Sequence, residues 1–287
     1  MTRPAGRTPR MDLTCLWRHL KARLATWRPD WEGVVDAAAT AGKDRLTQGA
    51  TPLPDEVIFE ALTVALLSGN TRWDRIARVR GALRDPFADF DLPRFASVSD
   101  EEIERNILPW FRERKAGAPG LRASLVRLRA AAAKLARHQG GAHRYLLDTR
   151  ASTTGSPEDL AVALATSKAW KLPGFGIALA AEALRNLGLD LCKPDRHVLR
   201  AVGAWSLVDF ARWKERGAFT PPQARAAELR ETMLAVRYLA EANQLPVSYA
   251  NSVIWTAGAV SGARLTNAAL RALTVGCGTG EARSQTV

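Results

Sequence analysis

The amino-acid sequence predicts an all-α fold. Apolar residues make up 47% of the 287 residues, which is typical of a chain that folds around a core. Apolar side chains recur at the 3.6-residue helical period, most clearly at Ala226, Leu229, Met233, Val236 and Ala240. No segment has the pattern of a strand, and no repeat of 20–50 residues is present. A chain of this length forms either one large domain or two helical lobes.

The N-terminal region predicts a tail followed by two helices. Residues 1–10 are basic and polar, and we expect them to be disordered. Helical patterns follow at about 11–26 and 30–42. Arginines alternate there with three tryptophans, Trp17, Trp27 and Trp31. These rings either stack on nucleic-acid bases or close the core of an N-terminal lobe, and the pattern alone favours the core.

The segment Asp55–Ser68 is apolar on almost every side, which predicts a central buried helix. It begins after the proline-containing break at 51–54 and ends in a short polar joint, residues 69–73. The next helix turns apolar positions to one face (Trp73, Ile76, Val79 and Leu83) and arginines to the other (Arg72, Arg75, Arg78 and Arg80). These arginines either form a solvated face or meet an anionic partner.

Further helices follow in the middle of the chain. Two prolines predict a loop over residues 85–97, after which Ser99 opens a helix with a capping box. An alanine-rich amphipathic helix is predicted at about 119–138 and a polar loop at 148–156. Ser156 then caps the next helix, with a proline at its first position.

The stretch Trp170–Arg200 combines a glycine turn with two helix starts. Its turn, Leu172–Gly176, contains a proline that fixes one backbone angle and two glycines that permit positive φ or close approach of another backbone. The apolar helix after the turn ends near Gly188, and the N–H groups at its start suit an anion such as phosphate. A second helix begins at Asp195, whose side chain is a good N-cap.

The last third of the chain predicts three more helices, at about 203–215, 222–241 and 247–261. The segment from Cys277 onwards is polar and contains glycines, and we expect residues 277–287 to be disordered.

Charge indicates the class of partner. Forty-one Lys and Arg oppose 29 Asp and Glu, a net charge of +12, and most of the excess is arginine, whose planar group suits phosphate. Nucleic acid is therefore the favoured partner, with an anionic membrane surface as the alternative.

The sequence also predicts a reduced, cytoplasmic protein. It has no run of 18 apolar residues and no apolar segment behind its N-terminus, so neither a membrane span nor secretion is expected. The three cysteines, Cys15, Cys192 and Cys277, lie far apart in the sequence, and we expect no disulfide framework. No CxxC spacing indicates zinc or an iron–sulfur cluster.

Three segments give the chain a resemblance to the helix–hairpin–helix DNA glycosylase superfamily. They are LPGFG (172–176) coupled to PDRHV (194–198), LLSGNT (66–71) and NSVIWTAGAVSG (251–262). In that superfamily an LPGxG-type hairpin precedes, by about twenty residues, an aspartate at a helix start. Here the interval from Gly174 to Asp195 is 195 − 174 = 21 residues.

This resemblance covers roughly residues 55–262 and implies two helical lobes with a cleft between them. Residues 11–72 and 200–275 would form a terminal lobe, and 73–199 a lobe that ends in the helix–hairpin–helix. The implied partner is double-stranded DNA with a damaged base, bound by a monomer associated with the nucleoid, with the damaged nucleotide flipped into a pocket.

The resemblance also implies roles for individual residues. The hairpin residues Gly174, Phe175, Gly176 and Ile177 would hold a DNA phosphate through their N–H groups. Asn70 would enter the gap left in the duplex, beside Arg72. The backbone carbonyls of Trp170, Leu172 and Phe175 would bind a structural Na⁺ or K⁺, and no other cofactor is implied. The candidate aromatics for the base pocket are Trp27, Trp31, Trp73, Trp110 and Phe111, although each of these rings is more often a core residue.

Asp195 would be the catalytic carboxylate, which stabilises an oxocarbenium-like sugar or orients water. Bifunctional relatives carry a lysine nucleophile where this chain has Ala178, so the resemblance implies a monofunctional glycosylase. The glutamate of adenine-excising relatives corresponds to Val64, and their four-cysteine cluster is absent. These departures favour the alkylpurine branch, which includes 3-methyladenine glycosylases. The alternatives are a noncatalytic DNA-binding protein and a bifunctional enzyme with a relocated lysine.

Overall fold

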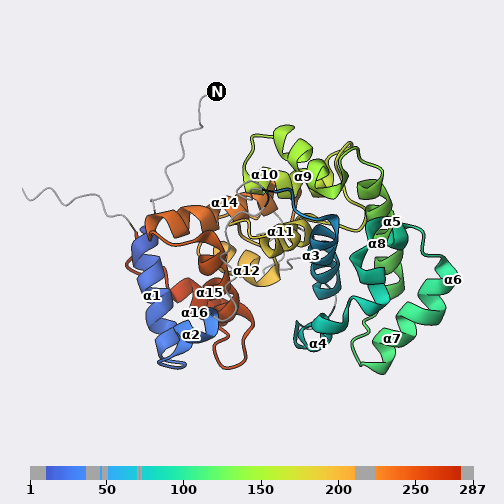
Figure 1. Ribbon diagram of the computed structural model, residues 1–287. Helices are drawn as coiled ribbons and strands as arrows, with labels where there is room; N and C mark the ends of the chain where they lie inside the picture. The colour runs from blue at the N-terminus through green and yellow to red at the C-terminus, as the bar shows by residue number, and fades with distance from the viewer. Residues whose placement is uncertain are drawn as a thin grey trace, which may run out of the picture. The chain divides into compact units, whose positions relative to one another are not determined.

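A computed structural model describes residues 11–36, 46, 51–69, 71, 73–210 and 224–278 (Figure 1). The described residues form helices joined by turns, with one isolated backbone bridge between Met11 and Gly278, which confirms the predicted all-α fold. The chain divides into two compact units. Unit 1 comprises residues 1–39 and 194–287, and unit 2 comprises residues 40–193.

Unit 1 is built around α12, which packs against α14, α15 and α16 (Figure 1). Helix α1 packs on α14, and α2 packs on α15. The helices of this unit are α1 (Leu13–Ala25), α2 (Trp31–Asp36), α12 (Arg196–Ala204), α14 (Ala226–Ala242), α15 (Val247–Ala259) and α16 (Asn267–Ala272). The helix predicted at 222–241 corresponds to α14, and Met233 and Val236 of its predicted apolar stripe are buried.

Unit 2 is built around α3 (Asp55–Ser68), which is buried along its length as its apolar sequence predicts. Helices α8, α9 and α11 pack against it. The other elements are α4 (Trp73–Val79), η1 (Arg80–Ala82), η2 (Asp85–Phe90), α5 (Leu92–Ala96), α6 (Asp100–Glu102), the π-helical η3 (Ile103–Ile107), α7 (Leu108–Glu113), α8 (Leu121–Ala136), α9 (Gly141–Ala151), α10 (Pro157–Thr166) and α11 (Ile177–Asn186).

The division into units differs from the expected lobes because of how two helices pack. We expected α3 in the terminal lobe, but its apolar surface is covered by helices of unit 2. The segment 194–199 belongs instead to unit 1, because α12 packs on α15. The boundary falls between Lys193 and Pro194.

Some expected loops are helical. The prolines in 85–97 stand at the first turns of η2 and α5, where a missing N–H costs nothing. Residues 87–89 form a kink inside η2, with positive φ at Ala88 and Asp89, so this part of the expected loop is irregular. Helix α9 continues to Ala151, and within it the Thr149 hydroxyl donates to the Tyr145 carbonyl at 2.7 Å. The expected helix at 203–215 is not found over its described residues: α12 ends at Ala204, and residues 211–223 lie outside the described part.

The expectations for the cysteines and for the C-terminal tail were wrong at Cys277. Cys277 is buried and forms a disulfide with Cys15 across a sequence separation of 262 residues. Its carbonyl accepts a hydrogen bond from the Asp12 N–H at 2.7 Å. Spacing along the chain did not reveal this pair, because the two residues are brought together by the overall fold and not by a local motif. The tails at 1–10 and 279–287 lie outside the described residues.

Among the described residues, no helix has the combination of length and apolar character that crossing a membrane requires.

Candidate nucleic-acid interface and catalytic carboxylate

The glycine turn connects α10 to α11, and its first glycine is required by the fold. Gly174 has a φ of +85°, a left-handed conformation that side chains rarely adopt. A Cβ atom at this position would lie 2.9 Å from the Arg127 Cβ on α8 and 3.4 Å from a methyl group of Leu66 on α3. Both conformation and packing therefore demand glycine at 174.

The second glycine of the turn is not required by the fold. Gly176 is the N-cap of α11, and its φ of −88° and ψ of 172° suit any residue. A Cβ atom there would meet nothing within 4 Å among the described residues. The position that a Cβ atom would take on Gly176 is therefore unobstructed by the described residues, beside the first N–H groups of α11, to which an anion could bind.

Side chains from α8 and α9 hold the backbone that enters the turn. The Lys134 ammonium donates to the carbonyls of Ala169 and Lys171, at 2.6 and 2.9 Å. The Tyr145 hydroxyl donates to the Trp170 carbonyl at 2.6 Å, and burial raises the pKa of Tyr145 to about 12, which keeps the phenol protonated. These three bonds fix successive carbonyls before the turn.

We expect Lys134→Met to loosen the turn without unfolding unit 2. Methionine keeps most of the aliphatic stem but removes two charge-assisted hydrogen bonds, and the free energy of unfolding should fall by about 1–3 kcal/mol. Chemical denaturation measures this loss, and Lys168→Met, an exposed lysine close to the turn, is the control. Equal stability of the two variants would contradict the role of Lys134.

Two of the three carbonyls predicted to bind a monovalent cation, those of Trp170 and Leu172, already accept hydrogen bonds from the protein. Trp170 accepts from Tyr145, and the Leu172 carbonyl accepts from the Phe175 N–H at 3.2 Å. Each carbonyl oxygen has a second lone pair, so these bonds leave capacity for an ion. The cation site remains a prediction.

The structure brings the end of the LLSGNT segment next to the helix that follows the turn. A Cβ atom at Gly69, the residue after α3, would lie 2.8 Å from a methyl group of Leu179 on α11. Two of the three segments that carry the resemblance are thus neighbours in unit 2. Asn70 and Arg72, the predicted DNA contacts at this joint, lie outside the described residues.

Asp195 lies in unit 1 and caps α12, as predicted. Its Oδ1 accepts hydrogen bonds from the N–H groups of His197 at 2.9 Å and Val198 at 3.1 Å. The side chain is half-buried. Within the described part of the chain, no hydrogen bond or ion pair to Oδ2 is found, so this oxygen remains available to a substrate or to water.

The third resembling segment forms most of α15, which packs on α12 behind Asp195. Gly258 lets α15 approach α12, since a Cβ atom there would lie 2.8 Å from the His197 Cβ. The His197 ring stands edge-on to Trp255, with 6.3 Å between ring centroids. Burial lowers the pKa of His197, and the Asp195 carboxylate opposes this shift in part. A neutral imidazole packed between α12 and α15 fits a structural role for His197 better than that of a proton donor.

We expect His197→Gln to reduce the pH dependence of stability. Because the pKa of His197 is lower in the folded state, the unfolded chain binds more protons as the pH falls below about 6.5, and wild-type stability is lost there. Glutamine does not titrate, so this contribution should disappear. Urea denaturation at pH 7.5 and pH 5.5 gives the free energy of unfolding of both proteins. An equal loss of stability between the two pH values in the wild type and in His197→Gln would contradict the assignment.

The four predicted pocket tryptophans are dispersed over both units. Trp31 is buried in the core of unit 1, and the Trp27 indole lies against the backbone of Gly262 in the same unit. Trp110 belongs to unit 2, where it lines a cavity of about 320 Å³ and Arg114 stacks over its ring at 4.2 Å. The side chain of Trp73 lies outside the described residues. None of these positions tests the pocket prediction.

Sequence reasoning did not single out the residues that support the turn. Arg127 is exposed and lies against Gly174, and Lys134 and Tyr145 bind the carbonyls before it. A partial signal was present, because Arg127 and Lys134 are seven residues apart and therefore share one face of α8. That face points to the turn only in the folded chain.

Comparison with known proteins supports the fold. No protein-family model and no curated protein matches the chain. Two solved structures from Methanocaldococcus jannaschii have a similar fold at 18% sequence identity. One is an 8-oxoguanine glycosylase/lyase in complex with a 15mer DNA containing 8-oxoguanine, with a TM-score of 0.50 over 79% of this chain and 89% of the other. The second is an 8-oxoguanine DNA glycosylase, with a TM-score of 0.51 over 83% and 92%.

Proposed function

We propose that this chain is a DNA glycosylase, which hydrolyses the N-glycosidic bond of a damaged base and leaves an abasic site. One observation carries the proposal: the LPGFG turn, open in front of its helix, is followed in sequence by a capping aspartate with a free carboxylate oxygen. The similarity of the fold to structures of DNA glycosylases supports it.

The turn would bind the DNA backbone. The N–H groups of Gly174, Gly176 and Ile177 lie in the turn and at the start of α11, where a phosphate oxygen can accept hydrogen bonds, whereas the Phe175 N–H already donates to the Leu172 carbonyl. The exposed guanidinium of Arg127 extends from beside Gly174 and would add a charged contact. The net charge of +12 favours the same partner, and binding should weaken steeply with salt.

Asp195 would perform the chemistry. Its Oδ1 is engaged by the start of α12, which fixes the carboxylate, and Oδ2 is the oxygen that would face the reacting sugar or its water. A negative charge there stabilises positive charge that develops on the sugar as the base leaves, or it orients the attacking water. A lysine nucleophile is not needed for this reaction.

We propose a monofunctional enzyme because of Ala178. This residue is in the first turn of α11, at the position where bifunctional relatives carry a lysine, and an alanine cannot form a Schiff base. Of the nearby lysines, Lys193 pairs with Glu182 at 3.7 Å. A lyase activity is the second candidate, because one of the similar structures is a glycosylase/lyase.

Alkylated purines are the substrates that we propose first. Such bases are cationic and leave readily, so one carboxylate can suffice without a strong general acid. 8-Oxoguanine is the second candidate, because both similar structures are of 8-oxoguanine glycosylases.

A panel of end-labelled duplexes tests the activity and the lesion. Each duplex carries one methylated, deaminated or oxidised base, and alkali converts abasic sites into strand breaks. We expect alkali-dependent cleavage at one class of lesion, and no excision from any duplex would contradict the proposal.

Borohydride trapping distinguishes the two mechanisms on the duplex that is cleaved. A monofunctional enzyme gives no covalent adduct and no break without alkali. An adduct that survives in Lys193→Ala and disappears in Lys171→Ala, or the reverse, would identify a relocated nucleophile and would refute the monofunctional assignment.

A further inference from the structure

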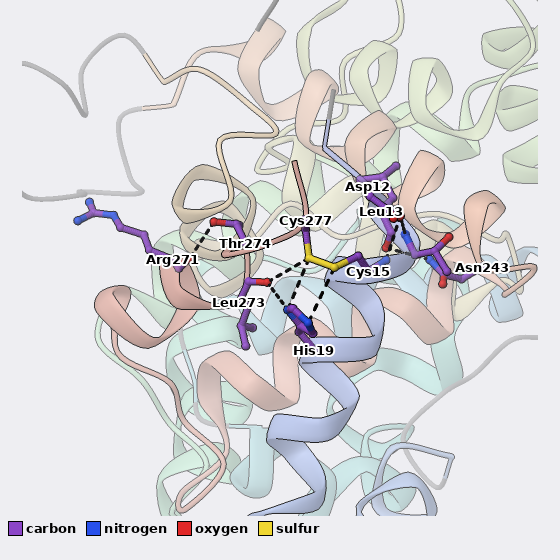
Figure 2. The surroundings of a disulfide bond; sticks show 10 residues. Asp12, Leu13, Cys15, His19, Asn243, Arg271, Leu273, Thr274 and Cys277 are labelled. Carbon is purple, nitrogen blue, oxygen red and sulfur yellow. Dashed lines mark hydrogen bonds between the residues drawn. A yellow bond between two sulfur atoms is a disulfide. The ribbon is translucent and has the colours of Figure 1, made fainter. Parts of the chain in front are cut away.

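Helix α1 and the C-terminal end of the described chain bring together three metal-ligating side chains. Cys15 and His19 are four residues apart on α1 and therefore share one face of that helix. Cys277 comes from the segment after α16, and Figure 2 shows its sulfur beside both of them. Together the three side chains form the α1–C-terminal cluster, and their ligand atoms all lie within 4.8 Å of one another.

The histidine has the arrangement of a ligand with a fixed ring. Its Nδ1 is 2.9 Å from the Leu273 carbonyl oxygen, which can only accept, so Nδ1 carries the proton. Nε2 then keeps its lone pair, and it lies 3.9 Å from the Cys15 sulfur. Metal-bound histidines are commonly held in this way, with one nitrogen on a backbone carbonyl and the other on the metal.

The spacing of the cluster suits a tetrahedral metal. Bonds of about 2.3 Å to sulfur and about 2.0 Å to nitrogen place a sulfur and a nitrogen ligand about 3.6 Å apart. The His19 Nε2, the nitrogen left with a lone pair, lies 3.9 Å from the Cys15 sulfur, and the ligand atoms of all three side chains lie within 4.8 Å of one another. Once the disulfide is reduced, the two sulfurs must separate to roughly the same spacing, because non-bonded sulfur atoms cannot approach more closely.

We propose that the reduced α1–C-terminal cluster binds one Zn²⁺ through Cys15, His19 and Cys277, with water as the fourth ligand. Two thiolates and an imidazole are soft enough to favour zinc over calcium or magnesium. Cys15 and Cys277 are buried, whereas His19 is half-exposed and gives the ion and its water access to solvent. The disulfide and the zinc site are alternative states of the same residues.

The disulfide state becomes the zinc-bound state by reduction followed by metal binding. A dithiol reductant transfers two electrons and two protons to the Cys15–Cys277 bond, and it becomes a cyclic disulfide itself. The two thiols then lose their protons to solvent as they bind Zn²⁺. In both states α1 stays attached to the chain end, which the bond from the Asp12 N–H to the Cys277 carbonyl also holds.

Zinc binding to the full-length protein tests the proposal. The protein is stripped with a chelator, divided into samples kept oxidised or reduced with a dithiol, loaded with Zn²⁺, desalted and analysed for metal. We expect one zinc per chain in the reduced wild type and none in the oxidised wild type. Cys192→Ala, which removes the buried cysteine that takes no part in the disulfide, is the matched control and should keep full stoichiometry.

Substitutions in the cluster complete the experiment. Cys15→Ser and Cys277→Ser should lose zinc, and His19→Ala should bind it at least about 100-fold more weakly. The proposal is overturned if the reduced wild type retains no zinc, if the oxidised protein binds as much, or if His19→Ala binds like the wild type.

Cobalt binding to the wild-type protein tests the site without any substitution, so the result does not depend on whether a variant folds. Co²⁺ added to the reduced wild type should produce a sulfur-to-metal charge-transfer band and the intense visible bands of tetrahedral coordination. The weak spectrum of octahedral Co²⁺ would overturn the proposal.

Discussion

Asp195→Asn should abolish base excision while leaving the fold and DNA binding intact. Asparagine offers the same oxygen to the His197 and Val198 N–H groups, and asparagine is as good an N-cap as aspartate, so α12 should keep its start. What the substitution removes is the negative charge. Loss of one electrostatic group of this kind typically lowers the rate by about 10²–10³-fold. Single-turnover excision on the duplex cleaved by the wild type measures the effect.

Asp195→Ala is the comparison that separates capping from catalysis. Alanine removes the charge and the cap together, so excision should fall as in Asp195→Asn and stability should fall by about 1 kcal/mol in addition. Full activity of Asp195→Asn would refute the catalytic role. Hairpin-dependent DNA binding with no excision by any variant, including the wild type, would instead support the noncatalytic DNA-binding protein.

Replacing the two glycines of the turn by alanine, one at a time, should have different effects on stability. Gly174→Ala places a side chain at a φ of +85° and 2.9 Å from the Arg127 Cβ, and we expect it to lower the free energy of unfolding by about 2–3 kcal/mol. Gly176→Ala meets no atom within 4 Å among the described residues, and because alanine is a poorer N-cap than glycine it should lower stability by up to about 1 kcal/mol. Denaturant melts measure both changes.

For DNA binding we expect a different pattern: Gly176→Ala should lose much affinity although it loses little stability. The methyl group of Gly176→Ala would stand where the phosphate approaches, and we expect the dissociation constant for duplex DNA to rise by about tenfold or more, which corresponds to about 1.4 kcal/mol. Fluorescence anisotropy at fixed salt measures it. Unchanged binding by Gly176→Ala would show that the open space in front of α11 is not used by DNA.

Local signals in the sequence predicted those parts of the structure that depend on local physics. The buried α3, the cap at Asp195 and the glycine at 174 follow from periodicity, side-chain chemistry and backbone angles within a few residues. The fold class followed from the same patterns.

Features that depend on long-range packing were not predictable in this way. The disulfide joins residues 262 apart, and the assignment of α3 to unit 2 depends on which helices cover its faces. Lys134 and Tyr145 carry no motif at all, and their importance lies in the carbonyls that they reach after folding.

The composition of unit 1 from both ends of the chain has a consequence for biosynthesis. Residues 40–193 form one continuous compact unit, so this part can fold as soon as it has left the ribosome. Helices α1 and α2 emerge before this unit, whereas their partners α14 and α15 are made after it. We expect α1 and α2 to remain unpacked, and so accessible to chaperones and proteases, until α14 and α15 have been made. A ribosome stalled before residue 226 should therefore carry a folded unit 2 together with unfolded α1 and α2.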